Sequence, residues 1–178
     1  ASTRGVNDSL AFRPDNERVA DVRVRKALLH ATNAKEIVQT LFTANYPQAK
    51  GVIVSTAAGF VDLSAELAFD EAKAKALLDE AGWVPQADGI RAKDGLPLVL
   101  STYESLNYLQ NREVLQLVAQ QWAKVGVKLN VLSGDLGSKT IDSLDPEKTA
   151  LIPAMVGRAD PDVIKSNYYP TNRNLLLQ

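Results

Sequence analysis

The chain has 178 residues, 46% of them hydrophobic and 23% charged, a composition typical of a globular protein with a buried core and incompatible with a disordered chain. Twenty basic residues against twenty-one acidic ones give a formal charge of −1, so the chain lacks the positive field that attracts nucleic acid or an anionic membrane. It contains no cysteine, which excludes disulfides, thiolate nucleophiles and cysteine zinc sites.

The first predicted elements are a strand and two helices. Residues 6–12, VNDSLAF, have the pattern of a strand that ends at the turn sequence PDN. The segment DVRVRKALLHA repeats its apolar residues with helical spacing behind Asp21, a residue type that caps helices. Asn33 opens a second helix, and Glu36 three positions later predicts a capping box, in which each side chain accepts from the other residue's N–H. The residues expected to be buried on these helices are Val24, Ala27, Leu28, Ala31, Ala34, Ile37, Val38, Leu41 and Phe42.

A long irregular connection and a third helix follow. Residues 45–68 are interrupted by proline and glycine, and a loop of this length either packs as a structured excursion or carries function. The next segment, FDEAKAKALLDEAGW, predicts a helix that is capped by Asp70 and ended by Gly82 in the left-handed conformation. Trp83 comes directly after that glycine, so we expect it to pack back onto Leu78 and to have a structural role.

The middle of the chain predicts a hairpin, a helix and a strand. The sequence DG is a two-residue turn signal between expected strands Ile90–Lys93 and Leu96–Thr102. A helix is predicted at about residues 108–124, and a short strand at Val127–Val131. The inner face of this helix is expected to carry Leu115, Val118, Ala119 and Trp122.

The last predicted element is a strand in TALIPAMVG, residues 149–157. Residues 132–148 before it are polar and rich in turn formers, with one helical turn expected at Thr140–Leu144. Helices therefore alternate with strands along the chain, which predicts an α/β (α+β mixed) fold with a mixed sheet flanked by helices. Residues 1–178 are expected to form one domain. The final TNRNLLLQ adds no closing element, so we expect the chain to be part of a longer protein.

Two features that often carry chemistry point to structural roles here. His30 is the only histidine, and no nucleophile or second metal ligand stands near it at a suitable spacing. Gly134 and Gly137 stand apart and do not form a phosphate-binding loop. The sequence therefore predicts no cofactor and no metal.

The strongest chemical signal is the motif GRADPD, which directly follows the last predicted strand. It contains Arg158, Asp160 and Asp162. The two carboxylates could be a catalytic pair, a socket for a cationic ligand group, or a turn in which Asp162 caps a following helix. They could also join in binding a metal ion, but their spacing lacks the further oxygen ligands of a calcium loop. Asp160 has no such local role. A carboxylate with apolar surroundings at a strand end is well suited to a ligand ammonium, and Arg158 is suited to a ligand carboxylate or to a pair with Asp160.

Several motifs together resemble one family. VRKALLHATNAKEIV, AKALLDEAGW, DGIRAKDGLPLVL, LVAQQWAKVGVKLNV and GRADPD follow one another in the order found in the family 5 extracytoplasmic solute-binding proteins. These proteins are the peptide-, dipeptide- and nickel-binding components of ABC importers. The resemblance covers most of the chain and corresponds to the second of two lobes that close on a ligand around a hinge.

The resemblance implies a binding protein without catalysis, located outside the cytoplasm in the periplasm or as a cell-surface lipoprotein. Its expected partners are a peptide or small solute, the importer's permease subunits and the first lobe of the same polypeptide, with no nucleic acid. In this family an aspartate after the last strand of the lobe holds the peptide ammonium, a role that would pass to Asp160. Gly157 stands where peptide binders often carry tryptophan, which leaves a nickel chelate or another small solute open as the ligand. A carboxylate-dependent hydrolase built on Asp160 and Asp162 is the alternative of another class.

Overall fold

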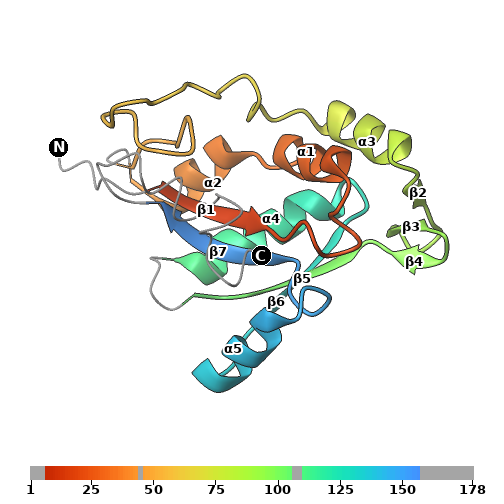
Figure 1. Cartoon of the computed structure of the whole chain (residues 1–178). Helices are drawn as coiled ribbons and strands as arrows, with labels where there is room; N and C mark the ends of the chain where they lie inside the picture. The colour runs from red at the N-terminus through yellow and green to blue at the C-terminus, as the bar shows by residue number, and fades with distance from the viewer. Residues whose placement is uncertain (1–6, 44–45, 106–109, 157–178) are drawn as a thin grey trace.

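The computed structural model describes residues 7–43, 46–105 and 110–156. Helices and strands alternate along these residues (Figure 1). The helices are α1 Val22–His30, α2 Ala34–Leu41, α3 Glu71–Glu80, α4 Asn111–Ala123 and α5 Leu136–Leu144. The strands are β1 Asn7–Phe12, β2 Val84–Pro85, β3 Arg91–Lys93, β4 Leu96–Pro97, β5 Val99–Tyr103, β6 Lys128–Leu132 and β7 Leu151–Val156. The predicted mixed α/β fold is confirmed.

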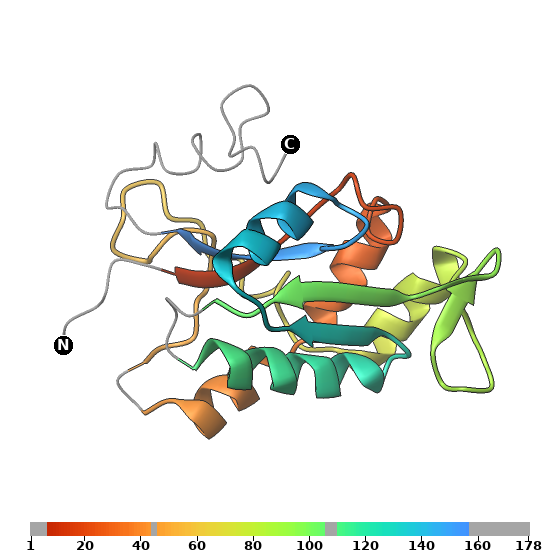
Figure 2. The same ribbon diagram turned by 90° about the horizontal axis from the view of Figure 1, so that it is seen from below.

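The central strands form two pairs of different direction. β1 and β7 are antiparallel, with Asn7 opposite Val156 and Phe12 opposite Leu151. β5 and β6 are parallel. The two pairs meet where the backbone N–H of Ala150 donates to the carbonyl of Ser101 at 3.0 Å. In Figure 2, β5, β6 and β7 all run in one direction, and β1 runs against them. The carboxyl ends of three strands therefore lie at one edge.

The predicted hairpin forms, but its second strand is shorter than expected. Asp94 and Gly95 both have positive φ, 52° and 82°, as a tight hairpin turn between β3 and β4 requires. The expected single strand Leu96–Thr102 is wrong, because it divides at Leu98 between two sheets. The N–H of Leu98 donates to the carbonyl of Arg91 at 2.7 Å, and its carbonyl accepts from Lys128 at 3.1 Å. This buried residue therefore joins the hairpin to the parallel pair.

The predicted helix caps form, with one change of partner at α2. Asp21 and Asp70 cap α1 and α3 as expected. Asn33 accepts from the N–H of Glu36 at 3.1 Å, but the reciprocal half of the predicted capping box is wrong. The N–H of Asn33 donates instead to Oε1 of Gln121 at 2.9 Å, and the Gln121 amide donates to Glu36 at 3.2 Å. A buried side chain of α4 thus replaces the local partner.

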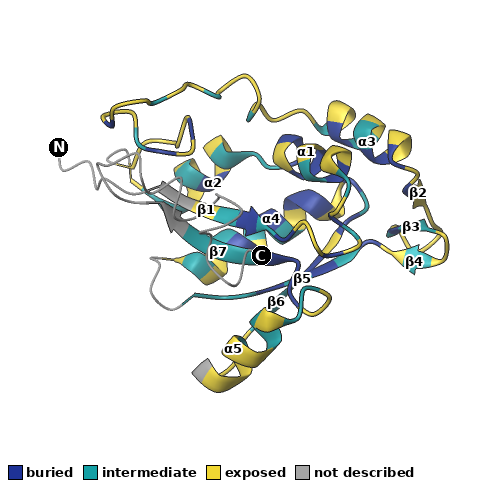
Figure 3. Cartoon of the chain, in the orientation of Figure 1, coloured by how far each residue is buried: buried dark blue, intermediate teal, exposed yellow. Residues whose placement is uncertain are grey.

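The main core lies between the helices and the strands. Val24, Ala27, Leu28 and Ala31 of the α1 segment are all buried, as predicted. In the predicted stripe of α2 only Ile37 is buried and the other residues are half-buried, because α2 lies at the margin of the core. Figure 3 shows the difference between the buried side of α1 and the surface of α5. The same buried cluster as the α1 residues also contains Leu78, Trp83, Leu100, Val118, Trp122 and Leu151.

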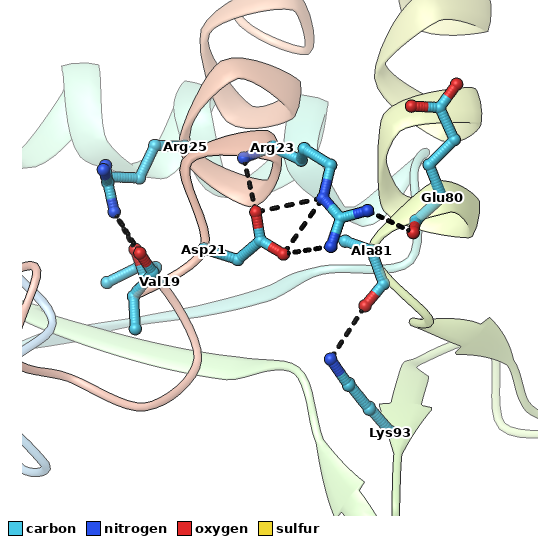
Figure 4. A network of polar contacts seen from close by, with 8 residues as sticks. Val19, Asp21, Arg23, Arg25, Glu80, Ala81 and Lys93 are labelled. Atoms are coloured by element: carbon cyan, nitrogen blue, oxygen red, sulfur yellow. Dashed lines mark hydrogen bonds and ion pairs between the residues drawn. The ribbon is translucent and has the colours of Figure 1, made fainter.

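Polar contacts hold α1 against the end of α3 (Figure 4). Arg23 pairs with Asp21 at 2.6 Å, and its guanidinium donates to the carbonyl of Glu80 at 2.7 Å. Lys93 of the hairpin donates to the carbonyl of Ala81 at 2.9 Å. The last carbonyls of a helix lack partners within the helix and carry partial negative charge, so these two cations stabilise the end of α3.

The connection before α3 packs as a structured excursion, the first of the two expected alternatives. Ile53 and Ala57 are buried in a small cluster with Val54 and Phe60. The N–H of Leu63 donates to the carbonyl of Lys50 at 2.7 Å and joins the two arms of the loop.

α5 is longer than the single turn expected at Thr140–Leu144. Asp135 caps it by accepting from the N–H of Ser138 at 3.0 Å. Glycine, serine and threonine give this segment a low helix propensity, so the pattern favoured turns. Tertiary hydrogen bonds to side chains of α5 override that preference, as described below.

Candidate functional site

The four predicted site residues lie outside the part of the chain that the structure describes. These residues are Gly157, Arg158, Asp160 and Asp162. Their roles therefore stay predictions. What the structure does give is the strand that precedes them, since β7 ends at Val156.

β7 ends at the edge where the parallel strands β5 and β6 also end. Tyr103, the last residue of β5, stands opposite Leu132, the last residue of β6. Thr102 fixes β7 beside β5, because its hydroxyl donates to the carbonyl of Leu151 at 2.9 Å. Ligands of open α/β sheets bind outside the carboxyl ends of the strands. This carboxyl edge is therefore the candidate functional site.

Four polar residues form a network at this edge, and we call them the edge cluster: Glu104, Arg112, Ser133 and Lys139. Glu104 directly follows β5, and its N–H donates to the carbonyl of Leu132 at 3.0 Å. Arg112 lies in the first turn of α4 and contacts Glu104 at 3.2 Å and the Ser133 hydroxyl at 3.1 Å. Lys139 of α5 donates to the carbonyl of Glu104 at 2.8 Å. The cluster thus ties the ends of two strands to two helices.

The edge cluster exposes positive charge more than negative charge. The side chain of Glu104 is 12% exposed, whereas that of Arg112 is 54% exposed. Arginine offers five donors in a planar fork that matches a carboxylate or a phosphate. An anionic group arriving from solvent would therefore meet Arg112 before Glu104. Sequence reasoning missed these residues, although Glu104 and Ser133 follow strands as Asp160 does.

A second polar contact at the same edge joins β5 to α5. The hydroxyl of Tyr103 donates to Oδ2 of Asp142 at 2.6 Å, and Lys148 contacts Oδ1 at 3.0 Å. The hydrogen bond from Tyr103, and then the one from Lys148, lower the pKa of Asp142 below its usual value. The bond to Asp142 raises the pKa of Tyr103. Asp142 therefore stays charged at neutral pH, and its role here is to position α5.

His30 has a structural contact in the described part of the chain. Its side chain is buried, and its Nδ1 lies 2.8 Å from the carbonyl oxygen of Ala68. Its own carbonyl accepts from the N–H of Asp70 at 2.8 Å. Both contacts hold the end of the long connection against α1, which agrees with the role expected from the sequence.

Trp83 is also structural, as predicted. It is buried in the main core with Leu78, and its N–H donates to the carbonyl of that residue at 2.9 Å. Gly82 before it has a φ of 86° and ends α3.

The two glycines of residues 134–137 do not form a phosphate cradle. Gly137 lies in the first turn of α5, where the carboxylate of Asp135 already accepts from the N–H and the hydroxyl of Ser138. These hydrogen bonds lower the pKa of Asp135, so a negative charge occupies the position that a phosphate would need.

A separate hollow of about 320 Å³ lies between the start of α2 and the long connection. Its lining combines two lysines with amide, hydroxyl and apolar groups, from Asn33, Lys35, Gln48, Lys50, Ser64, Leu67, Ala68 and Phe69. Among the described residues, no cluster of three or more histidine or acidic side chains could hold a metal ion. Nor is any helix within those residues long and apolar enough to cross a membrane.

Comparisons with known proteins agree with this arrangement. The chain is similar in structure to NikA from Brucella suis in complex with Fe(III)-EDTA, with a TM-score of 0.83 and 25% identity. That likeness covers 99% of this chain and 36% of the other. The dipeptide-binding protein of Escherichia coli strain K12 is 26% identical over 163 residues, which are 91% of this chain and 28% of that protein. The glutathione-binding protein GsiB of Salmonella typhimurium is 31% identical over 120 residues, 67% of this chain and 21% of that protein.

The chain therefore spans only about a quarter of the length of these two relatives. Residues 1–172 match the family model described as "Bacterial extracellular solute-binding proteins, family 5 Middle". Since that match covers nearly the whole chain, the chain belongs to the bacterial extracellular solute-binding proteins of family 5.

Proposed function

We propose that residues 1–178 are the second lobe of an extracytoplasmic solute-binding protein that delivers oligopeptides or dipeptides to an ABC importer. The observation that carries this proposal is the family match over residues 1–172. The similarity to a dipeptide-binding protein over 91% of the chain favours peptides as the ligand. Membership of a solute-binding family also favours binding over the hydrolase considered from the sequence.

The proposed mechanism places the ligand against the carboxyl edge of β5, β6 and β7. Asp160 follows β7 at this edge and holds the peptide's ammonium, because a charge-assisted hydrogen bond is strong where water is excluded. Arg158 faces a ligand carboxylate or pairs with Asp160 before the ligand arrives. Gly157 and Asp162 belong to the same proposed ligand-binding segment.

Binding then requires a second surface. The first lobe of the same polypeptide closes over the ligand around a hinge, and contacts to both lobes favour the closed state. The closed protein docks on the importer's permease subunits outside the cytoplasm, in the periplasm or as a lipoprotein at the cell surface. A single lobe offers about half of the contacts, so we expect residues 1–178 alone to bind peptides only weakly.

A second candidate ligand is a metal chelate or another small anionic solute. The observation that favours it is the structural likeness to a protein described with Fe(III)-EDTA, over 99% of this chain. The exposed guanidinium of Arg112 at the carboxyl edge is suited to the carboxylates of such a chelate.

Titration calorimetry on the complete polypeptide encoded by the gene would test both candidates. Dipeptides and a mixture of longer peptides form one arm, and nickel with L-histidine forms the other. We expect saturable binding of peptides, at least 100-fold weaker in the isolated 178 residues because half of the contacts are missing. Binding of the nickel chelate alone would favour the second candidate, and binding of neither would contradict the proposed function.

A further inference from the structure

The guanidinium of Arg112 lies across the carboxyl ends of β5 and β6. Its Nη1 is 3.2 Å from Oε2 and 3.3 Å from Oε1 of Glu104, the residue that follows β5. The same nitrogen donates to the hydroxyl of Ser133, the residue that follows β6, at 3.1 Å. α4 begins on the side of the molecule where both strands end, as Figure 1 and Figure 2 show from two directions. Arg112 therefore reaches the place where ligands of open α/β sheets bind.

Much of the hydrogen-bonding capacity of Arg112 is unused within the described residues. A guanidinium carries its N–H donors on three nitrogens, and every hydrogen bond of this one runs through Nη1. Nε and Nη2 lie on one edge of the planar group, where their spacing matches the two oxygens of a carboxylate. Since the side chain is 54% exposed, this edge is available to a ligand.

The edge cluster carries an excess positive charge that one further carboxylate would balance. It contains two cations, Arg112 and Lys139, against the single carboxylate of Glu104. Lys139 donates to the backbone carbonyl of Glu104 at 2.8 Å, and the Glu104 side chain is only 12% exposed. A nearly buried counter-ion therefore holds the guanidinium from one side and fixes its orientation.

We propose that Arg112 binds the carboxylate of the ligand through Nε and Nη2, and that Glu104 positions the guanidinium for this contact. This proposal rests on the proposed function, because it requires a ligand at the carboxyl edge. It deepens that function by assigning the C-terminal carboxylate of a peptide to Arg112 and not to Arg158. β7 lies beside β5, so one ligand would contact Asp160 after β7 and Arg112 over β5 and β6. The site then selects solutes that carry both an ammonium and a carboxylate.

Titration calorimetry on the complete polypeptide can test this contact with a bound peptide and with the same peptide amidated at its C-terminus. The wild type would be compared with Arg112→Gln, Glu104→Gln and Arg158→Gln. Lys124→Gln is the matched control, since it removes one positive charge from an exposed position at the other end of α4. If a nickel chelate is the ligand, nickel with L-histidine and nickel with L-histidinamide replace the two peptides, because the amide lacks the carboxylate.

We expect amidation to weaken binding by about 10-fold in the wild type and in Lys124→Gln, as the loss of one charge-assisted hydrogen bond implies. Arg112→Gln should weaken binding of the free peptide by a similar factor. In this variant amidation should then cost less than about threefold, because the partner of the carboxylate is already missing. Glu104→Gln keeps an oxygen that accepts from Nη1 and removes the competing charge, so it should bind the free peptide at least as tightly as the wild type. Should Arg112→Gln not fold, Arg112→Lys retains the charge without the planar fork and should also discriminate less than the wild type.

Equal losses of affinity for both peptides in Arg112→Gln, or no loss, would overturn the proposal; equal losses would point to a contact with the first lobe. Loss of discrimination in Arg158→Gln alone would also overturn it and assign the carboxylate to Arg158. Weakening by Glu104→Gln as large as that by Arg112→Gln would show that the pair has only a structural role. Each of these results still includes binding by the wild type, so the proposed function would stand. A wild type that binds neither peptides nor the chelate would overturn both.

Discussion

Arg91 allows a sharp test of what holds the hairpin to the rest of the fold. Its side chain is only 4% exposed. Its Nε donates to the carbonyl of Val125 at 2.8 Å, its Nη1 donates to the carbonyl of Trp83 at 2.6 Å, and the guanidinium pairs with Asp79. One residue of β3 thereby joins the end of α3 to the turn before β6. Arg91→Met keeps most of the side-chain volume and removes all of these bonds.

The expected loss of stability follows from burial. Each carbonyl left without a donor costs about 1–3 kcal/mol, whereas the pair with Asp79 adds little because that carboxylate is 60% exposed. The new apolar packing offsets part of the loss, so we expect the free energy of unfolding to fall by about 3 kcal/mol. For a domain of this size that corresponds to a decrease in melting temperature of roughly 6–12 °C.

Urea unfolding followed by far-UV circular dichroism would measure the change. The matched control is Arg23→Met, since Arg23 also donates to a carbonyl at the end of α3 but is 46% exposed and should cost less than about 1 kcal/mol. If Arg91→Met were no more destabilising than Arg23→Met, the buried hydrogen bonds would not hold the hairpin as argued.

Two further predictions concern a turn and the hydrogen bond from Tyr103 to Asp142. In urea unfolding, Gly126→Ala should destabilise the protein by about 1–3 kcal/mol more than the control Gly89→Ala. Both glycines have positive φ, so both substitutions strain the backbone. Only at Gly126 would the new Cβ also clash, because it would lie 2.7 Å from Cγ of Arg91, whereas a Cβ at Gly89 meets nothing within 4 Å. Equal losses would show that left-handed strain alone matters there. The lowered pKa of Asp142 stabilises the folded state above the unfolded value of 3.8, and this contribution is lost as the pH falls through the lower folded pKa. Tyr103→Phe removes the hydrogen bond that contributes most to the lowered pKa of Asp142. Between about pH 5 and 2 the urea midpoint of this variant should therefore fall less than that of the wild type. Urea midpoints that decrease in parallel in the two proteins would contradict this.

Local features of the fold were predictable from sequence because their partners lie within a few residues. Asp21, Asn33 and Asp70 each accept from an N–H two or three positions later, so residue type and spacing were enough to place three helix starts. The stops at Gly82 and Gly126 follow from the left-handed backbone that glycine adopts easily.

Features that depend on distant partners were not predictable in the same way. Gln121 takes the place of Glu36 at the cap of α2 only because α4 packs there, 88 residues further along the chain. The division at Leu98 depends on a parallel pairing with β6, and the length of α5 depends on contacts from Tyr103 and Arg13. Tertiary contacts override local preference at each of these places.

The candidate site divides in the same manner. The sequence pointed to Asp160 because a charged residue after an apolar strand stands out locally. The same reasoning applies to Glu104 after β5, but its importance depends on Arg112 and Lys139, which only the fold brings to it. From the sequence, the candidate site was predicted only at the end of the last strand. In the structure the ends of β5, β6 and β7 lie at one edge and share it.

The proposed function depends most on Asp160 binding the positively charged end of the ligand at this carboxyl edge. Calorimetry on the complete polypeptide should compare a bound peptide with its N-acetylated form, in the wild type, in Asp160→Asn and in the control Glu66→Gln, a substitution at an exposed position of the long connection. We expect acetylation or Asp160→Asn to weaken binding by about 10- to 150-fold, the value of one charge-assisted hydrogen bond, and the second change to add little to the first. Undiminished affinity of Asp160→Asn for the free peptide would contradict the account.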